Sequence, residues 1–257
     1  MTAKAQDDDS GGRMAIRAAG GNLVVSRETS EGSMDNDELN LGPELAPDHD
    51  VLTAIFGART TLVLQYHDML ATRGVEWGLL GPREANRLWS RHILNCVAVR
   101  SLIPSDATVL DVGSGAGLPG IPLALARPDL RVTLLDSLLR RVNFLELAVA
   151  ELNLGNRVDV VRARAEEVTE RYDVVLSRAV APLGRLIDWC EPLMVRRLVA
   201  IKGESAETEL REAEMTLARR HLTAKVIQAR DQVSNISTTA ILVERDESVV
   251  HKQEHGI

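Results

Sequence analysis

The sequence has few aromatic residues, few cysteines and no long apolar run. Phe, Trp and Tyr together make up 3% of its 257 residues, which leaves few rings on which single-stranded bases could stack. The two cysteines, Cys96 and Cys190, lie far apart without the spacing of a metal site, so we expect reduced thiols and no metal. Without a run of about eighteen apolar residues or an apolar signal segment, we expect a cytoplasmic protein with no membrane contact.

Positive charge is also scarce. The formal net charge is −7 at pH 7, which does not by itself indicate a nucleic-acid-binding protein. The hydrophobic share of 45% is enough for a full core. Residues 1–40 lack hydrophobic periodicity, and we expect a disordered tail there. We further expect a helical cap over residues 41–104, the main domain over 105–246 and a short tail over 247–257.

The segment before the main domain has a helical pattern. Asp50 is expected to cap a first helix, whose apolar positions run from Leu52 to Leu70. Pro82 suits the first position of a second helix, which continues to Leu102. We expect these helices to pack over one edge of a sheet formed by the rest of the chain.

The second of these helices carries a group of polar residues. Arg91 and Asn95 are four positions apart, and His92 and Asn95 are three apart, so they are neighbours on the helix surface. Two interpretations remain open: a solvated face with one half-buried histidine, or a polar cluster that overhangs a binding cleft.

A strand, a glycine-rich turn and a helix follow one another at the start of the main domain. Thr108–Val112 is apolar and β-branched, which predicts a buried strand. Gly113, Gly115 and Gly117 follow it, and we predict a helix over Leu118–Ala126 with its prolines in the first turn. Such a turn is expected to leave backbone N–H groups free at the helix start and to let a nucleoside approach the main chain.

Two kinds of cofactor fit this turn. The stretch from Gly115 to Gly120 satisfies the dinucleotide pattern G-x-G-x-x-G, with Asp136 downstream as the acid. However, the strand runs directly into Gly113, which gives the fuller pattern D-x-G-x-G-x-G from Asp111. A carboxylate there repels phosphate but attracts a cationic ligand. The pattern resembles motif I of the S-adenosylmethionine-dependent methyltransferases, whose cofactor carries a sulfonium, an ammonium and no phosphate.

Strands and helices alternate through the rest of the chain. Ser137 is expected to cap the helix after the second strand, and Gly155 to close it. A single polar helix is expected over residues 205–221, and the two strands after it should pair antiparallel because no helix separates them. This pattern predicts an α/β doubly wound sheet of seven strands with an antiparallel last strand. The six strands expected after the first cover residues 132–135, 158–161, 172–176, 198–201, 224–227 and 239–243.

Polar residues follow several of these strands, at the edge of the sheet where such folds bind ligands. Asp136 can accept hydrogen bonds from both ribose hydroxyls, or it can merely cap a helix. Ala165 and Glu166 are placed to meet an adenine edge, although Glu166 can equally be solvated surface. Arg178 follows the fourth strand and can hold a phosphate or the face of a base.

Taken together, these segments resemble the RsmG (GidB) family, the small-subunit ribosomal RNA guanine-N7 methyltransferases. The resemblance covers roughly residues 45–245, nearly everything except the tail. It implies the class I S-adenosylmethionine-dependent methyltransferase fold behind an N-terminal helical cap. The segments that carry it are Leu88–Leu94, Asp111–Pro122, Leu134–Ser137 with Arg140–Val142, Ser177–Ala179 and Leu198–Gly203.

The resemblance implies the following site. Arg178 is expected to position substrate and cofactor, with Arg91 and His92 as further catalytic residues. Asn95 departs from the family, because many relatives carry an aspartate there, and any role that needs a carboxylate at this position is in doubt. The residues expected to bind S-adenosylmethionine are Asp111, Gly113, Gly115, Gly117, Leu118, Asp136, Ala165, Glu166 and Arg178.

The reaction implied is in-line methyl transfer to N7 of a guanine, without a general base. We expect a monomer that acts on 16S rRNA or on the assembling small ribosomal subunit. Because the whole chain is acidic, RNA contact would depend on a local basic patch. The candidates for this patch are Arg91, Arg140, Arg141, Arg164, Arg178 and Lys202.

Absent motifs narrow the chemistry. The fourth strand is not followed by the Asp/Asn-Pro-Pro-aromatic turn of exocyclic-amine methyltransferases, and neither cysteine is placed as a nucleophile. Two alternatives from other classes remain open: an NAD(P)-dependent oxidoreductase that uses the G-x-G-x-x-G pattern, and a non-catalytic ribosome-binding protein on the same fold.

Overall fold

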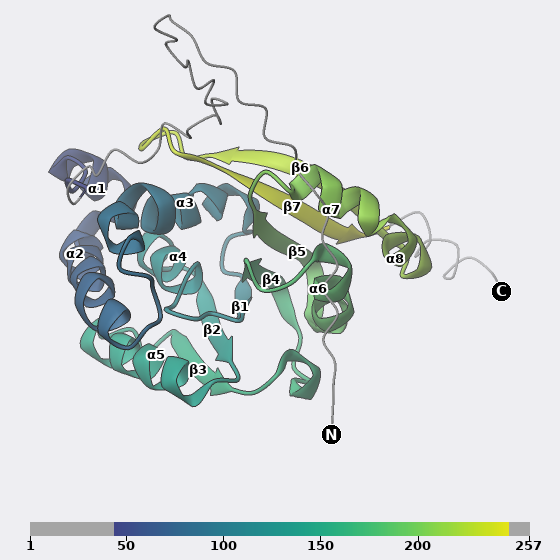
Figure 1. The fold of residues 1–257 in the computed structure, drawn as a ribbon, viewed down its shortest axis with the longest axis horizontal. Helices are drawn as coiled ribbons and strands as arrows, with labels where there is room; N and C mark the ends of the chain where they lie inside the picture. The colour runs from purple at the N-terminus through teal and green to yellow at the C-terminus, as the bar shows by residue number, and fades with distance from the viewer. Residues whose placement is uncertain (1–43, 247–257) are drawn as a thin grey trace, which may run out of the picture. The chain divides into compact units, whose positions relative to one another are not determined.

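The computed structural model describes residues 44–246, so the tails expected over 1–40 and 247–257 lie outside the described residues. One seven-stranded sheet, in the order β3-β2-β1-β4-β5-β7-β6, organises these residues (Figure 1). Its strands are β1 Thr108–Val112, β2 Arg131–Asp136, β3 Val158–Arg162, β4 Tyr172–Arg178, β5 Met194–Lys202, β6 Leu222–Arg230 and β7 Ser237–Arg245.

The direction of the strands confirms the predicted fold. Strands β3, β2, β1, β4 and β5 are mutually parallel, and β7 is antiparallel to both β5 and β6. The strand order reverses between β1 and β4, where Asp111 is paired with Leu134 on one side and Leu176 on the other. Ligands of such sheets bind beyond the carboxyl ends of the strands at this switch point.

Helices cover both faces of the sheet (Figure 1). Alternate residues of the central strands enter different apolar clusters: Val109 and Leu134 belong to one cluster, whereas Leu110 and Leu135 belong to the other. Because both faces are covered there, the central strands β1, β2, β4 and β5 are mostly apolar and buried. The polar helix predicted over 205–221 is in fact two helices that meet at Ala213. The helices are α4 Gly120–Ala126, α5 Leu139–Glu151, α6 Leu183–Cys190, α7 Ala206–Glu212 and α8 Glu214–Arg219.

The residues before β1 form the expected helical cap, but in shorter pieces. Asp50 is the second residue of α1 and does not cap it, and Pro82 lies in a turn before the second group of helices. The single helix expected up to Leu102 is divided into 3₁₀, π and α segments, and π-turns frequently mark functional sites. The cap contains α1 His49–Phe56, α2 Thr60–Met69, α3 Leu94–Val97, the π-turns Leu70–Gly74 and Leu88–Ile93, and the 3₁₀ segments Gly57–Arg59, Glu84–Arg87 and Ala98–Leu102.

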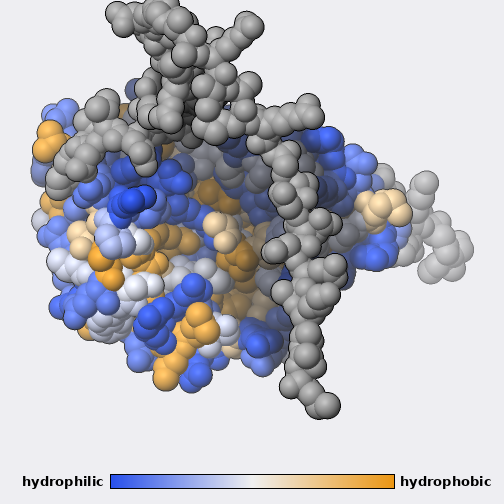
Figure 2. Space-filling view, viewed as in Figure 1, coloured by the Kyte–Doolittle hydropathy of each residue, from blue (hydrophilic) through white to orange (hydrophobic). Residues whose placement is uncertain are grey.

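The cap covers a face of the sheet rather than the edge we expected. Phe56, Tyr66 and Trp89 of the cap belong to the same apolar cluster as Ile121 of α4 and Phe144 of α5. In Figure 2 polar residues predominate on the visible outer surface and apolar residues show between them, as expected of helices that turn one face to a core. The cap and the sheet therefore share one hydrophobic core.

Three expected helix ends are wrong in detail. Helix α4 begins at Gly120 rather than Leu118, so only Pro122 lies in its first turn. Ser137 does not cap α5, because Leu138 stands at the capping position and no side chain makes a capping hydrogen bond there. Gly155 does not close α5, because Asn153 adopts the left-handed conformation just after that helix, with φ 52°. No helix within residues 44–246 is long and apolar enough to cross a membrane.

Candidate active site

The glycine turn after β1 directs its amides toward the protein itself. Gly113, Gly115 and Gly117 have φ of 72°, 60° and 92°, which glycine adopts without strain. The expectation of free backbone donors is wrong for most of this turn, so the turn has few amides left to hold a pyrophosphate. The N–H groups of Gly113 and Ser114 donate to Leu135 O, that of Gly115 to Asp136 Oδ2, those of Gly117 and Leu118 to Ser114 O, and that of Gly120 to Asp111 Oδ2.

Asp111 is a fully buried acid with one unused oxygen. Its Oδ2 accepts the Gly120 N–H at 3.0 Å, whereas its Oδ1 has no hydrogen-bond partner. Burial raises the pKa of this carboxyl to about 7. A buried oxygen without a partner is costly, and a cationic ligand would satisfy it. This feature fits the sulfonium and ammonium of S-adenosylmethionine better than the phosphates of a dinucleotide.

A first pocket, of about 310 Å³, lies beyond the ends of β2 and β3. Asp136 is buried there, and its Oδ2 accepts from the Gly115 N–H at 3.1 Å and from Arg141 at 3.3 Å. Of the residues predicted to bind the cofactor, Gly113, Asp136, Ala165 and Glu166 line this pocket, whereas Gly115, Gly117 and Leu118 shape the turn beside it. We call it the adenosine pocket for the ligand portion it would suit.

A second pocket, of about 650 Å³, opens on the other side of Val180, and we call it the acceptor pocket. Val180 lines both pockets, and its Cγ2 lies 2.7 Å from where a Cβ on Gly113 would stand. The two pockets therefore meet at one side chain beside the glycine turn. The acceptor pocket is lined by Arg91, Asn95, Arg178, Ala179, Val180, Ala181, Pro182, Ile201, Lys202, Gly203, Ser205, Glu209, Glu212 and Thr238.

Arg178 lies in the acceptor pocket as the last residue of β4, which extends two residues beyond its predicted end at residue 176. Its Nη2 donates to His92 Nδ1 at 2.8 Å and to Arg91 O at 3.1 Å, and its Nη1 contacts Cys96 Sγ at 3.3 Å. Burial raises the pKa of the Cys96 thiol to about 11, so it stays protonated. The structure thus brings together Arg178, Arg91 and His92, the three residues predicted to be catalytic. Asn95 Oδ1 accepts from the Thr238 hydroxyl at 3.1 Å.

Comparison with known proteins identifies the family of this chain. A family model described as "rRNA small subunit methyltransferase G" matches residues 59–236. The ribosomal RNA small subunit methyltransferase G of Salinispora tropica is 54% identical over 180 residues, which cover 66% of this chain and 73% of that protein. The protein of the same name from Thermobifida fusca is 50% identical over 199 residues, 76% and 84% of the two chains.

The chain belongs to the GidB family. It is therefore an S-adenosylmethionine-dependent methyltransferase. The crystal structure of the magnesium protoporphyrin IX methyltransferase ChlM from Synechocystis, with bound S-adenosylmethionine, superposes with a TM-score of 0.50 at 16% identity. The alignment covers 78% of this chain and 100% of that one. This likeness confirms the class I fold alone, and the oxidoreductase alternative is not favoured.

Sequence reasoning missed three residues of this GidB site. Glu84 accepts a hydrogen bond from His92, the Tyr66 hydroxyl donates to Ala116 O at 2.7 Å, and Val180 separates the pockets. Glu84 and Tyr66 lie in the cap, and no spacing in the sequence relates them to the glycine turn. Val180 was inconspicuous because a valine carries no chemistry of its own.

Five of the six candidates for a basic patch line one or other of the two pockets. Arg141 and Arg164 line the adenosine pocket, and Arg91, Arg178 and Lys202 line the acceptor pocket, whereas Arg140 lines neither. Lys202 is neutralised by Glu209 at 2.7 Å, and Arg141 lies 3.3 Å from Asp136. The basic groups thus border the site without forming one continuous patch in it.

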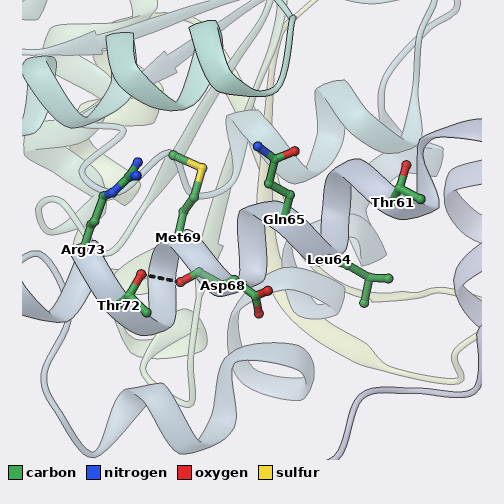
Figure 3. Close-up of a pocket in the computed structure, with 7 residues that line it drawn as sticks. All are labelled: Thr61, Leu64, Gln65, Asp68, Met69, Thr72 and Arg73. Carbon is green, nitrogen blue, oxygen red and sulfur yellow. Dashed lines mark hydrogen bonds between the residues drawn. The ribbon is translucent and has the colours of Figure 1, made fainter.

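A third hollow, of about 450 Å³, runs along α2 away from these residues (Figure 3). Figure 3 shows Gln65, Met69 and Arg73 on one side of the helix and Leu64 on the other. Gln65 and Arg73 both bind Glu151 of α5. The hollow therefore borders a contact between the cap and α5.

Two glycine substitutions should separate close packing from backbone strain in this turn. A Cβ at Gly120 would lie 2.3 Å from Leu134 Cδ2 and 2.8 Å from Asp111 Oδ2, whereas one at Gly115 meets nothing closer than 3.9 Å. We expect Gly120→Ala to destabilise the fold by about 1–3 kcal/mol through overpacking and to displace Asp111. Gly115→Ala should cost about 1–2 kcal/mol of left-handed backbone strain alone and leave Asp111 in place.

Thermal unfolding and S-adenosylmethionine titration check this pair. The expected outcome is weakened cofactor binding in Gly120→Ala and near-normal binding in Gly115→Ala. Normal binding by Gly120→Ala would show that the Asp111–Gly120 contact does not matter to the cofactor.

Proposed function

We propose that this GidB protein transfers the methyl group of S-adenosylmethionine to N7 of a specific guanine in 16S rRNA. The observation that carries the proposal is the meeting of the two pockets at Val180. On one side Asp136, Ala165 and Glu166 suit an adenosine, and on the other Arg178 and the polar wall suit a base. The printed names of the relatives support a target in the small-subunit RNA.

The reaction needs little catalytic machinery. S-adenosylmethionine supplies an electrophilic methyl group on its sulfonium, and guanine N7 has an in-plane lone pair with no proton to lose. No general base is therefore required. Holding donor and acceptor in line can contribute roughly 7–11 kcal/mol. Asp111 would face the positive part of the donor, and Asp136 would accept from the ribose. Arg178 would hold the acceptor base at the rim of its pocket.

We further propose a cytoplasmic monomer that acts on the RNA of the assembling small subunit. The arginines that border the site support contact with the RNA phosphates, and we expect the shape of the RNA surface to provide the rest of the recognition. The cap over 41–104, with Arg91 and His92, would form one wall of the acceptor site, and 105–246 would supply the donor site.

Small subunits from a strain that lacks this protein are the decisive substrate. Incubation with the purified protein and S-adenosylmethionine should introduce one 7-methylguanosine into 16S rRNA, detected by mass spectrometry of the digested RNA. Micromolar binding of NADH without binding of S-adenosylmethionine would overturn the proposal. Binding of S-adenosylmethionine without methyl transfer to the subunit or to naked rRNA would favour the non-catalytic alternative.

A further inference from the structure

A line of three side chains connects the cap to the end of β4. The Oε2 of Glu84 lies 2.6 Å from His92 Nε2, and His92 Nδ1 lies 2.8 Å from Arg178 Nη2. Glu84 belongs to a 3₁₀ segment and His92 to the π-turn that follows it. The imidazole is buried, whereas the side chain of Glu84 is 35% exposed. The histidine therefore links the acid to Arg178 by two successive hydrogen bonds.

The hydrogen bonds fix the protonation state of His92. A guanidinium has donors and no acceptor, so Nδ1 must present its lone pair to Arg178. The ring proton then lies on Nε2 and is donated to Glu84. Burial, followed by the charges of Arg178 and Arg91, lowers the pKa of His92, and Glu84 opposes this shift. A neutral histidine with one defined tautomer is the state that can accept from Arg178.

The same contacts leave part of Arg178 available to a ligand. Its five N–H donors include one used by His92, one by Arg91 O and one by the Cys96 thiol. All three partners lie in the cap, and the guanidinium lines the acceptor pocket. The cap thus fixes the plane of the group, and two donors remain free of these contacts.

We propose that Glu84 is a positioning residue for methyl transfer, which acts through His92 to hold the Arg178 guanidinium at the acceptor pocket. This inference rests on the proposed function. Carboxylates that accept from a histidine in this way orient the ring and strengthen its other nitrogen as an acceptor. The negative charge of Glu84 also offsets Arg178 and Arg91, which lies 3.4 Å from it. That offset favours the purine cation formed at N7.

A double-mutant cycle tests the inference in the full-length protein. Glu84→Gln should lower kcat for methyl transfer by about tenfold, the lower end for loss of such a partner, with the KM for S-adenosylmethionine little changed. His92→Asn should lower kcat by a similar amount, because it removes the ring through which Glu84 acts on Arg178. Adding Glu84→Gln to His92→Asn should then cost nothing further. Glu76→Gln, an exposed acid of the cap, is the matched control.

Three results of the mutant cycle would overturn the inference. They are wild-type kcat in Glu84→Gln, a loss in Glu84→Gln that persists in the His92→Asn background, and a loss matched by lower thermal stability. The last two would show that Glu84 only ties the cap together.

Nitrogen-15 NMR of histidine-labelled protein supplies a readout without RNA. The histidine resonances that are present in the wild type and absent from His92→Asn belong to His92. They should show that Nε2 is protonated and that Nδ1 is not. This result stands even if 16S rRNA proves not to be the substrate, and a protonated Nδ1 would refute the inference.

Discussion

Replacement of Arg178 by alanine is expected to lower kcat/KM for methyl transfer by about 10²–10³, the usual cost of removing one well-placed donor from a reaction centre. The guanidinium lies where β4 ends and is held by His92, Arg91 O and Cys96. Without it the acceptor base would lose its orientation, and a small displacement from the in-line geometry is costly. Transfer of a radiolabelled methyl group to small subunits measures the loss.

Two companion variants make the Arg178 result interpretable. Arg178→Lys keeps the positive charge but not the planar set of donors, so it should recover only part of the activity. Arg219→Ala removes an exposed arginine of α8 and should behave as the wild type. Turnover of Arg178→Ala at the wild-type rate, with its unfolding temperature unchanged, would remove Arg178 from the site.

Asp111→Asn is expected to weaken S-adenosylmethionine binding by about 10–100-fold, the equivalent of roughly 1.4–2.7 kcal/mol, and yet to raise the stability of the free protein at pH 8. The amide oxygen can still accept from Gly120, but the negative charge that we propose faces the cationic donor is lost. A buried carboxylate is costly to ionise, so its removal favours the folded state at high pH. Calorimetry and thermal unfolding measure the two opposite effects.

The sign of the pH dependence follows from the raised pKa of Asp111. The folded protein holds this proton up to about pH 7, whereas an unfolded aspartate releases it near 3.8. Its contribution to stability is therefore full below that lower value and is lost as the pH rises through about 7. Cofactor affinity should instead increase over the same range, with release of a proton on binding. Asp111→Asn, which has no carboxyl to titrate, should bind S-adenosylmethionine equally at pH 6 and pH 8. Equal affinity at the two pH values in the wild type as well would contradict this assignment.

The sheet could be predicted from sequence because its strands carry an unambiguous signal. Val109 to Val112 and Val132 to Leu135 are short apolar runs buried on both faces. The ends of the helices were harder, because tertiary contacts decide them. Asp136 accepts the N–H groups of both Gly115 and Leu138, so one carboxylate takes part in the glycine turn and in the turn before α5. Ser137 does not cap that helix.

The site was predictable as far as it follows from strand ends. Asp136, Ala165 and Arg178 all lie where their strands stop, and a parallel sheet brings such positions to one edge. The contacts made by the cap were not predictable in this way. Glu84 meets His92 because a 3₁₀ segment passes directly into a π-turn there. A regular helical period, assumed from apolar spacing, does not describe that path.

The core shared by the cap and the sheet has a consequence for dissecting this enzyme. Phe56, Tyr66 and Trp89 are nearly fully inaccessible to solvent, and they rest against the first helix that follows the glycine turn. A shortened protein that starts at β1 would leave that helix bare and deprive Arg178 of all three of its anchors. The part of the protein from β1 onward is therefore not expected to fold and work as an isolated domain. Chimaeras between relatives should exchange the cap and the sheet together.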